Sequence, residues 1–141
     1  MKLTYPACFY EDKKTKEYTV VVPDLEGCTT SGSNLSDAIE MAQDAASGWI
    51  VTSMENNEKI PEASEINNTK LDPDLIDGQS FVSILSLDIS AYMEKYNSDR
   101  IEKTLTIPVW LNNFAEKRHL NFSKILQESL IKIYQKAKSY K

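Results

Sequence analysis

Side chains that could perform catalysis are few in this chain. His119 is the single histidine, so no second histidine is available to share acid–base work. Cys8 and Cys28 are the two cysteines, and neither a C-x-x-C pair nor a glycine-rich phosphate loop accompanies them. Spacing typical of a Ser-His-Asp triad or of a zinc site is also missing. The sequence therefore predicts a protein that is not an enzyme and holds no metal ion or cofactor.

Cys8 and Cys28 are better explained as reduced packing residues, with a disulfide or a redox role as the alternative. The first six residues, 1–6, lack the apolar core of an export signal and resemble the start of a strand. No apolar run is long enough to span a membrane. We therefore expect a cytoplasmic protein with no membrane partner.

Near the end of the chain, a different group of side chains could hydrogen-bond to DNA. The run 100–108 alternates threonine with apolar side chains at its centre: Thr104, Leu105, Thr106 and Ile107. This period of two, with β-branched residues, predicts a short strand that is buried on one face. If Leu105 and Ile107 face a dimer core, Glu102, Thr104 and Thr106 point outward, where threonine hydroxyls can contact base edges in a DNA groove.

Two amphipathic helices are expected after this strand. Pro108 ends the strand, and Trp110, Leu111 and Phe114 follow at helical spacing as far as about residue 121. Ser123 is the expected N-cap of a second helix that extends towards residue 138. A strand and two helices in about forty residues are too small to stand alone. A second copy pairing antiparallel with the strand would form a ribbon-helix-helix dimer that binds DNA.

This interpretation assigns roles to particular residues. The expected dimerisation residues are Leu105, Ile107, Trp110, Leu111, Phe114, Leu126 and Leu130. The expected DNA-binding residues are Arg100, Glu102, Lys103, Thr104, Thr106, Ser123 and Lys124. Ser123 and Lys124 would offer helix N–H groups to a phosphate, and Glu102 would repel phosphate but could accept from cytosine. The alternative is a module that only assembles dimers.

The charges of the two ends of the chain differ in sign. Residues 100–141 hold nine Lys or Arg and three Asp or Glu, a net charge of +6, whereas residues 1–99 hold seven basic and eighteen acidic residues, a net charge of −11. A basic end favours phosphate and an acidic end favours a basic partner. The alternative is that both charges only keep the protein soluble.

The sequence of the N-terminal part predicts the order βββ-α-β. Strands are expected at 2–10 and 17–22, with Pro6 marking an edge or a bulge, and residues 27–32 are expected to form a short third strand or an extended loop. A helix follows from the N-cap Asn34, with Asp37 at its third position, to about residue 54. A long polar loop over 55–80 precedes a strand at 81–87 that is apolar on both faces, as expected with neighbours on both sides, and a short connector follows over 91–99.

The segment Val20-Val21-Val22-Pro23-Asp24-Leu25-Glu26-Gly27-Cys28, followed by Leu35-Ser36-Asp37-Ala38, resembles the opening of HicB antitoxins. In that family a strand ends in Pro-Asp-hydrophobic-x-Gly-Cys and leads to a helix that starts Leu-x-x-Ala. Its C-terminal module is a helix-turn-helix or a ribbon-helix-helix, and residues 100–138 look like the latter. The likeness covers nearly the whole chain.

The resemblance implies a function. HicB proteins neutralise a HicA toxin, a small basic ribonuclease that cuts messenger RNA, and repress their own operon as DNA-binding proteins. It implies an α+β chain with three parts: a partial ribonuclease H-like toxin-binding domain over 1–89, a linker over 90–99, and a ribbon-helix-helix domain over 100–141, acting as a homodimer or tetramer. Asp24 and Glu26 are the expected toxin contacts, and the alternative for Asp24 is that it fixes the turn.

Two other functions remain as alternatives. A stand-alone ribbon-helix-helix regulator could sense a small ligand through its N-terminal domain. A ribonuclease H relative could also be a nuclease, with Asp24 and Asp88 as metal ligands. Two carboxylates are too few for a convincing two-metal site, so the antitoxin interpretation is preferred.

Overall fold

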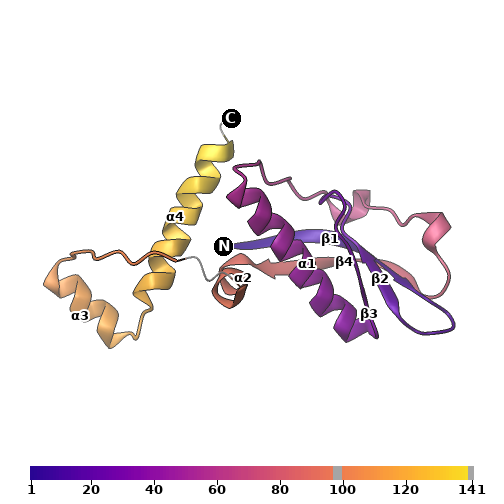
Figure 1. Ribbon diagram of the computed structural model, residues 1–141, viewed down its shortest axis with the longest axis horizontal. Helices are drawn as coiled ribbons and strands as arrows, with labels where there is room; N and C mark the ends of the chain where they lie inside the picture. Colours follow the sequence, from indigo (N-terminus) through magenta and orange to yellow (C-terminus); the bar gives the residue numbers. More distant parts are fainter. Residues whose placement is uncertain (97–99, 140–141) are drawn as a thin grey trace.

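The computed structural model describes residues 1–96 and 100–139 and shows an α+β fold (Figure 1). Its strands are β1 (Lys2–Glu11), β2 (Tyr18–Val21), β3 (Thr29–Gly32) and β4 (Ser80–Asp88). Its helices are α1 (Leu35–Glu55), α2 (Ile89–Tyr96), α3 (Val109–Lys117) and α4 (Phe122–Ser139), with short 3₁₀ helices η1 (Ile66–Asn68) and η2 (Pro73–Leu75). Within these residues, no helix is both long and apolar enough to cross a membrane.

The four strands form one antiparallel sheet in the order β3-β2-β1-β4. The predicted βββ-α-β order is therefore confirmed. The prediction that the last of these strands has neighbours on both sides is wrong, because among the described residues β4 pairs only with β1. Its apolar side chains face α1 on one side and the loop that precedes it on the other. Pro6 lies where β1 pairs with β4 alone, since the pairing with β2 begins at Cys8, so its missing N–H leaves the β1–β2 ladder intact.

One face of the sheet packs against α1 and contains the core. Alternate residues of β1, such as Tyr5 and Phe9, are buried there with Leu85 of β4 and Ile50 of α1. Helix α1 contributes small side chains at helical spacing, Ala38, Ala42 and Ala46, all with no exposed surface. These small residues bring the helix close to the sheet. A Cβ at Gly32 would lie only 2.3 Å from the Ala38 nitrogen.

Hydrogen bonds define both ends of α1. The Asp37 N–H donates to the side chain of the N-cap Asn34 at 2.9 Å, as predicted, and the Asp37 carboxylate accepts from the Ser33 N–H at 2.8 Å. At the other end, Asn57 adopts a left-handed conformation with a φ of 57°. The Asn57 and Glu58 N–H groups then donate to the Met54 and Ser53 carbonyls, which closes the last turn.

The other face of the sheet is covered by residues 56–79, which we call the covering segment. In Figure 1 this segment leaves the end of α1, runs the length of the sheet and returns into β4. The Cys8 thiol donates to the Lys70 carbonyl at 3.8 Å, and the Tyr10 hydroxyl accepts from the Asp72 N–H at 2.9 Å. Because of this cover, Cys8 and Tyr10 are buried although they face away from α1.

The segment after β4, expected to be a short connector, is helical over most of its described length. Helix α2 begins at Ile89, and its Ala91 N–H donates to the Asp88 carboxylate at 3.1 Å. Ile89 is fully buried, and Tyr92 packs on Tyr96 within the helix. Residues 97–99 of the predicted linker lie outside the described residues.

Candidate DNA-binding and protein-binding surfaces

The segment expected to form the DNA-binding ribbon is extended but forms no strand within this chain. Residues 101–107 are all exposed, including Ile101 at 80%, Leu105 at 61% and Ile107 at 44%. Burying apolar side chains that are this exposed would be strongly favourable. A ribbon between two chains would not form in a single chain, so the ribbon stays a prediction.

Helices α3 and α4 also present apolar side chains to solvent. The expected dimerisation residues Trp110, Leu111, Phe114 and Leu130 are 70%, 37%, 46% and 55% exposed, and Leu126 is half-buried. Figure 1 shows α3 projecting away from the sheet beyond α4. A helix of nine residues is marginal in water without tertiary packing. This region therefore lacks a core of its own.

A second face of α4 packs on the N-terminal part of the chain. Ile131 is buried, and the Tyr134 hydroxyl donates to the Met54 carbonyl at the end of α1 at 3.3 Å. Tyr134 and Gln135 line a groove of about 400 Å³ together with residues 2–5 and 59–63. Helix α4 thus contacts the body through one face and leaves Phe122, Ile125, Leu130 and Ile133 exposed.

The connection between α3 and α4 corrects one predicted cap. Helix α4 begins at Phe122, and its N-cap is Asn121, whose side chain accepts from the Lys124 N–H at 3.0 Å. Ser123 is therefore in the first turn and is not the cap. The Lys124 N–H is already bonded, so the groups left to meet a phosphate are those of Phe122 and Ser123, which precede the first intrahelical bond from Ile125 to Asn121.

His119 ends α3 in a left-handed conformation, with a φ of 53°. Its N–H donates to the Glu116 carbonyl, and the Leu120 N–H donates to the Ala115 carbonyl. This pattern is the Schellman motif, in which glycine is the usual residue at the left-handed position. His119 is thus part of a helix end, and its side chain is exposed.

The predicted DNA-binding residues lie along one exposed stretch and at the start of α4. Glu102, Lys103, Thr104 and Thr106 are exposed, and so is Arg100, whose guanidinium donates to the Met93 carbonyl of α2 at 3.3 Å. Arg100 therefore links the extended segment to the N-terminal part of the chain. That these threonines form one DNA-binding surface with Ser123 and Lys124 remains a prediction.

Asp24, an expected toxin contact, bonds to the covering segment. Its two carboxylate oxygens accept from the Ser64 N–H at 2.8 Å and from the Ser64 hydroxyl at 2.6 Å. Nearby, the Tyr5 hydroxyl donates to the Pro61 carbonyl at 2.5 Å. Burial, and secondarily the negative charge of Asp24, raises the pKa of Tyr5 to about 12. Asp24 thus holds a loop forty residues away in sequence, which the sequence did not reveal.

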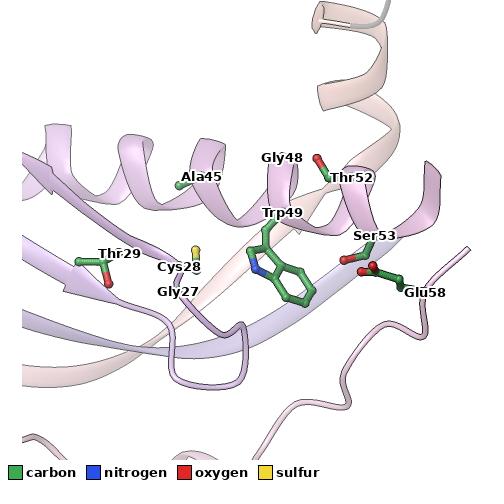
Figure 2. A pocket seen from close by; sticks show the side chains of 9 residues that line it. All are labelled: Gly27, Cys28, Thr29, Ala45, Gly48, Trp49, Thr52, Ser53 and Glu58. Carbon is green, nitrogen blue, oxygen red and sulfur yellow. The ribbon is translucent and has the colours of Figure 1, made fainter. Parts of the chain in front are cut away.

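Glu26, the other expected toxin contact, lies beside a cleft of about 390 Å³ between α1 and the β2–β3 loop. Figure 2 shows the Trp49 indole projecting from α1 into this cleft. Its N–H donates to the Glu26 carbonyl at 2.9 Å, while the Glu26 side chain is exposed. Burial raises the pKa of the Cys28 thiol, which therefore stays protonated. Of the described residues that line the cleft, Glu58 alone is charged.

The carboxylates proposed for a nuclease site have structural partners. Asp24 bonds Ser64, and Asp88 accepts from the first turn of α2. In the described ranges, no three His, Cys, Asp or Glu side chains are grouped so that they could hold a metal ion.

Comparison with known proteins identifies the family. Residues 5–129 match the model of the HicB-like antitoxin of bacterial toxin–antitoxin systems. The chain belongs to the HicB-like antitoxin family. This confirms the family inferred from the Pro-Asp-Leu-Glu-Gly-Cys segment and the Leu-Ser-Asp-Ala helix start.

Relatives of this HicB-like antitoxin include a phage protein and solved structures. An uncharacterised 14.9 kDa protein from the rep-hol intergenic region of Haemophilus phage HP1 is 30% identical over 109 residues, which are 77% of this chain and 76% of that protein. A chain of a toxin–antitoxin complex from Streptococcus pneumoniae is 31% identical, with a TM-score of 0.60 over 94% of this chain and 99% of that one. The Burkholderia pseudomallei antitoxin HicB, 22% identical with a TM-score of 0.55 over 91% of this chain and 96% of that one, shares the fold.

Proposed function

We propose that this HicB-like antitoxin neutralises a HicA-like messenger RNA ribonuclease and represses its own operon as a DNA-bound dimer. In this proposal residues 1–89 bind the toxin, residues 90–99 join the two parts, and residues 100–141 dimerise and bind operator DNA. The observation that carries it is the apolar surface left exposed on residues 101–133 beside a basic net charge.

The dimer is the first element of the proposal. A second copy would bury Leu105, Ile107 and Trp110, and it would pair the backbone of residues 101–107 into a two-stranded ribbon. The other expected dimerisation residues, Leu111, Phe114, Leu126 and Leu130, would form the core between the helices. This ribbon-helix-helix assignment is supported by the order of an extended segment followed by α3 and α4.

DNA binding follows from the outward side of that ribbon. Thr104 and Thr106 would contact base edges, and Arg100 and Lys103 would approach phosphates or bases, with Glu102 between them. Ser123 and Lys124, at the start of α4, would approach the backbone of the DNA. The net charge of +6 over residues 100–141 supplies the attraction to phosphate.

Toxin binding is assigned to the acidic N-terminal part. The net charge of −11 over residues 1–99 suits a basic ribonuclease, and a relative of this chain occurs in a solved toxin–antitoxin complex. A partial ribonuclease H-like fold is supported by the β1–β2–β3 meander followed by α1.

Two experiments test the proposal. Co-expression with the small basic protein encoded beside it should abolish that protein's toxicity, and purified 1–96 should be enough to inhibit it. A mobility-shift assay on the upstream DNA should show a specific complex. Thr104→Ala with Thr106→Ala should weaken that complex by about 1–3 kcal/mol for each base that a threonine recognises. Continued toxicity, or a complex unchanged by both substitutions, would contradict the corresponding part.

The alternative, a regulator that senses a small ligand, draws support from the cleft beside Trp49. It predicts an operator complex whose affinity changes with a metabolite and not with a toxin. Trp49 fluorescence would report ligand binding there, because its indole projects into the cleft (Figure 2).

A further inference from the structure

The covering segment, residues 56–79, is a long irregular loop in a small fold. Apart from η1 and η2 it has no regular structure over twenty-four residues. Loops longer than about 12–15 residues without secondary structure are uncommon in compact domains and are usually functional or disordered. Its hydrogen bonds show that this segment is ordered.

Contacts with the sheet and with the loops between its strands hold the covering segment along its whole length. Near its start, Pro61 and Ser64 bond Tyr5 and Asp24. In its middle, Lys70 and Asp72 bond Cys8 and Tyr10 of β1. Near its end, the Lys13 N–H donates to the Asp77 carboxylate at 2.8 Å, and the Gly78 N–H donates to the Glu11 carbonyl at 2.8 Å. A segment fixed at so many points presents its outer side in one arrangement.

The outer side of this segment combines apolar and acidic side chains. Ile66, Leu75 and Ile76 are 40%, 48% and 48% exposed. The segment has six acidic residues and two lysines, and Glu62, Glu65 and Asp74 are exposed beside those apolar positions. If the segment only covered the sheet, its apolar side chains would face β1 and β4. Three of them face solvent instead, which is typical of a contact surface.

We propose that the outer side of the covering segment is the surface with which this protein binds a cationic protein, and that Asp24 acts as a positioning residue for it. The inference deepens the proposed function and rests on it, because the cationic protein is then the toxin. Leu75, Ile76 and Ile66 supply the apolar contacts, and the carboxylates around them supply complementary charge. Asp24 holds Ser64 and so fixes the first half of the surface.

The charge of the segment decides the class of partner. Six carboxylates against two ammonium groups repel DNA and RNA phosphates and attract a surface rich in lysine or arginine. The exposed isoleucine and leucine side chains favour a protein over a small cation, because they are removed from water only against another apolar surface.

The first experiment compares two matched double substitutions in the full chain. The probe is the HicA-like toxin of the proposed function, made inactive by substitution of a catalytic residue, and calorimetry measures its Kd. Leu75→Ser with Ile76→Ser should weaken binding at least ten-fold. Ile39→Ser with Met41→Ser, which changes side chains of similar exposure on α1 (37% and 43%), should stay within two-fold. Both variants should keep the wild-type melting temperature and dimer.

The results distinguish a failure of the proposed function from a failure of this inference. If the wild-type protein does not bind the probe, the proposed function fails and this inference fails with it. If the wild-type protein binds and the Leu75/Ile76 variant binds equally well, the proposed function stands and the covering segment is not the contact surface. Glu65→Gln with Asp74→Asn supplies a second measurement: it should weaken binding most at low salt, and an unchanged salt dependence would overturn the charge argument.

The second experiment tests the role of Asp24. Ser64→Ala removes one of the two hydrogen bonds to Asp24 and changes no charge. If Asp24 acts through the segment, this substitution weakens probe binding several-fold and speeds amide hydrogen exchange over residues 59–70. If Ser64→Ala leaves both unchanged while Asp24→Asn weakens binding, Asp24 contacts the partner directly and its positioning role is wrong.

Discussion

The two ends of this antitoxin differ in how much of their apolar surface they bury. Up to Tyr96, the large apolar residues Phe9, Ile50 and Leu85 are at most 2% exposed. Within residues 100–137, Ala115 and Ile131 are the buried apolar residues, and Val109 and Trp110 are at least 70% exposed. Burial of apolar area is the main favourable term in folding, and only the first part has a buried core among the described residues.

The contacts between the two parts also leave most of the apolar surface of the basic end exposed. Helix α4 reaches the N-terminal part through Ile131 and Tyr134, and Arg100 reaches α2. These contacts use a single face of α4 and leave the rest of residues 100–133 exposed. They attach the basic end to the acidic N-terminal part, but they do not give the basic end a core.

The largest expected effect comes from charging the ribbon. Leu105→Asp with Ile107→Asp should make the protein monomeric at micromolar concentration, because four carboxylates would then meet in the dimer core. Sedimentation would measure the mass, and the melting of residues 1–96 should stay unchanged. Ile39→Asp with Met41→Asp is the matched control and should remain dimeric. A dimer that survives the first variant would show that the basic end does not assemble through this segment.

A second test addresses the core of the N-terminal part. Gly32→Ala would place a methyl group 2.3 Å from the Ala38 nitrogen, which should lower the free energy of unfolding by about 3 kcal/mol. Gly27→Ala is the control: its Cβ meets nothing within 4 Å, but its φ of 78° should make the change unfavourable by about 1 kcal/mol. Urea denaturation would measure both. Equal decreases would mean that α1 does not lie this close to β3.

A smaller, opposite effect is expected at the end of α3. His119→Gly should stabilise the proposed dimer by about 1 kcal/mol, because glycine adopts the left-handed conformation without the steric penalty of a Cβ. His119→Ala keeps the Cβ and should give no such gain. Concentration-dependent thermal melting measures the change. The isolated 1–96 fragment does not contain residue 119, so any change in melting comes from the basic end.

The last test concerns pH and the N-terminal part. The pKa of Tyr5 is raised to about 12 in the folded protein, against about 10 in an unfolded chain. Between these values the unfolded chain loses its proton first, so stability falls as pH rises from 10 towards 12. Tyr5→Phe should make this fall shallower, as urea unfolding at pH 9 and pH 11 would show. Equal slopes in the two proteins would mean that Tyr5 is not buried beside Asp24.

Local signals in the sequence predicted most of the elements. The Asn34 cap, the alanine stripe of α1 and the alternation in β1 and β2 act over a few residues, so they can be found without the fold. Helix α2 was missed although Ile89, Tyr92, Met93 and Tyr96 have helical spacing. The cap of α4 was placed two residues late, because Asn121 and Ser123 are both good N-cap residues and only the backbone distinguishes them.

By itself, the sequence determined the family, the βββ-α-β order and the opposite charges of the two ends. Each depends on residue types and on spacing along the chain. Only the tertiary structure decided that β4 lies at the sheet edge, that residues 56–79 cover the second face, and that Asp24 bonds Ser64. These facts join positions forty or more residues apart, and such pairings depend on how the whole chain packs.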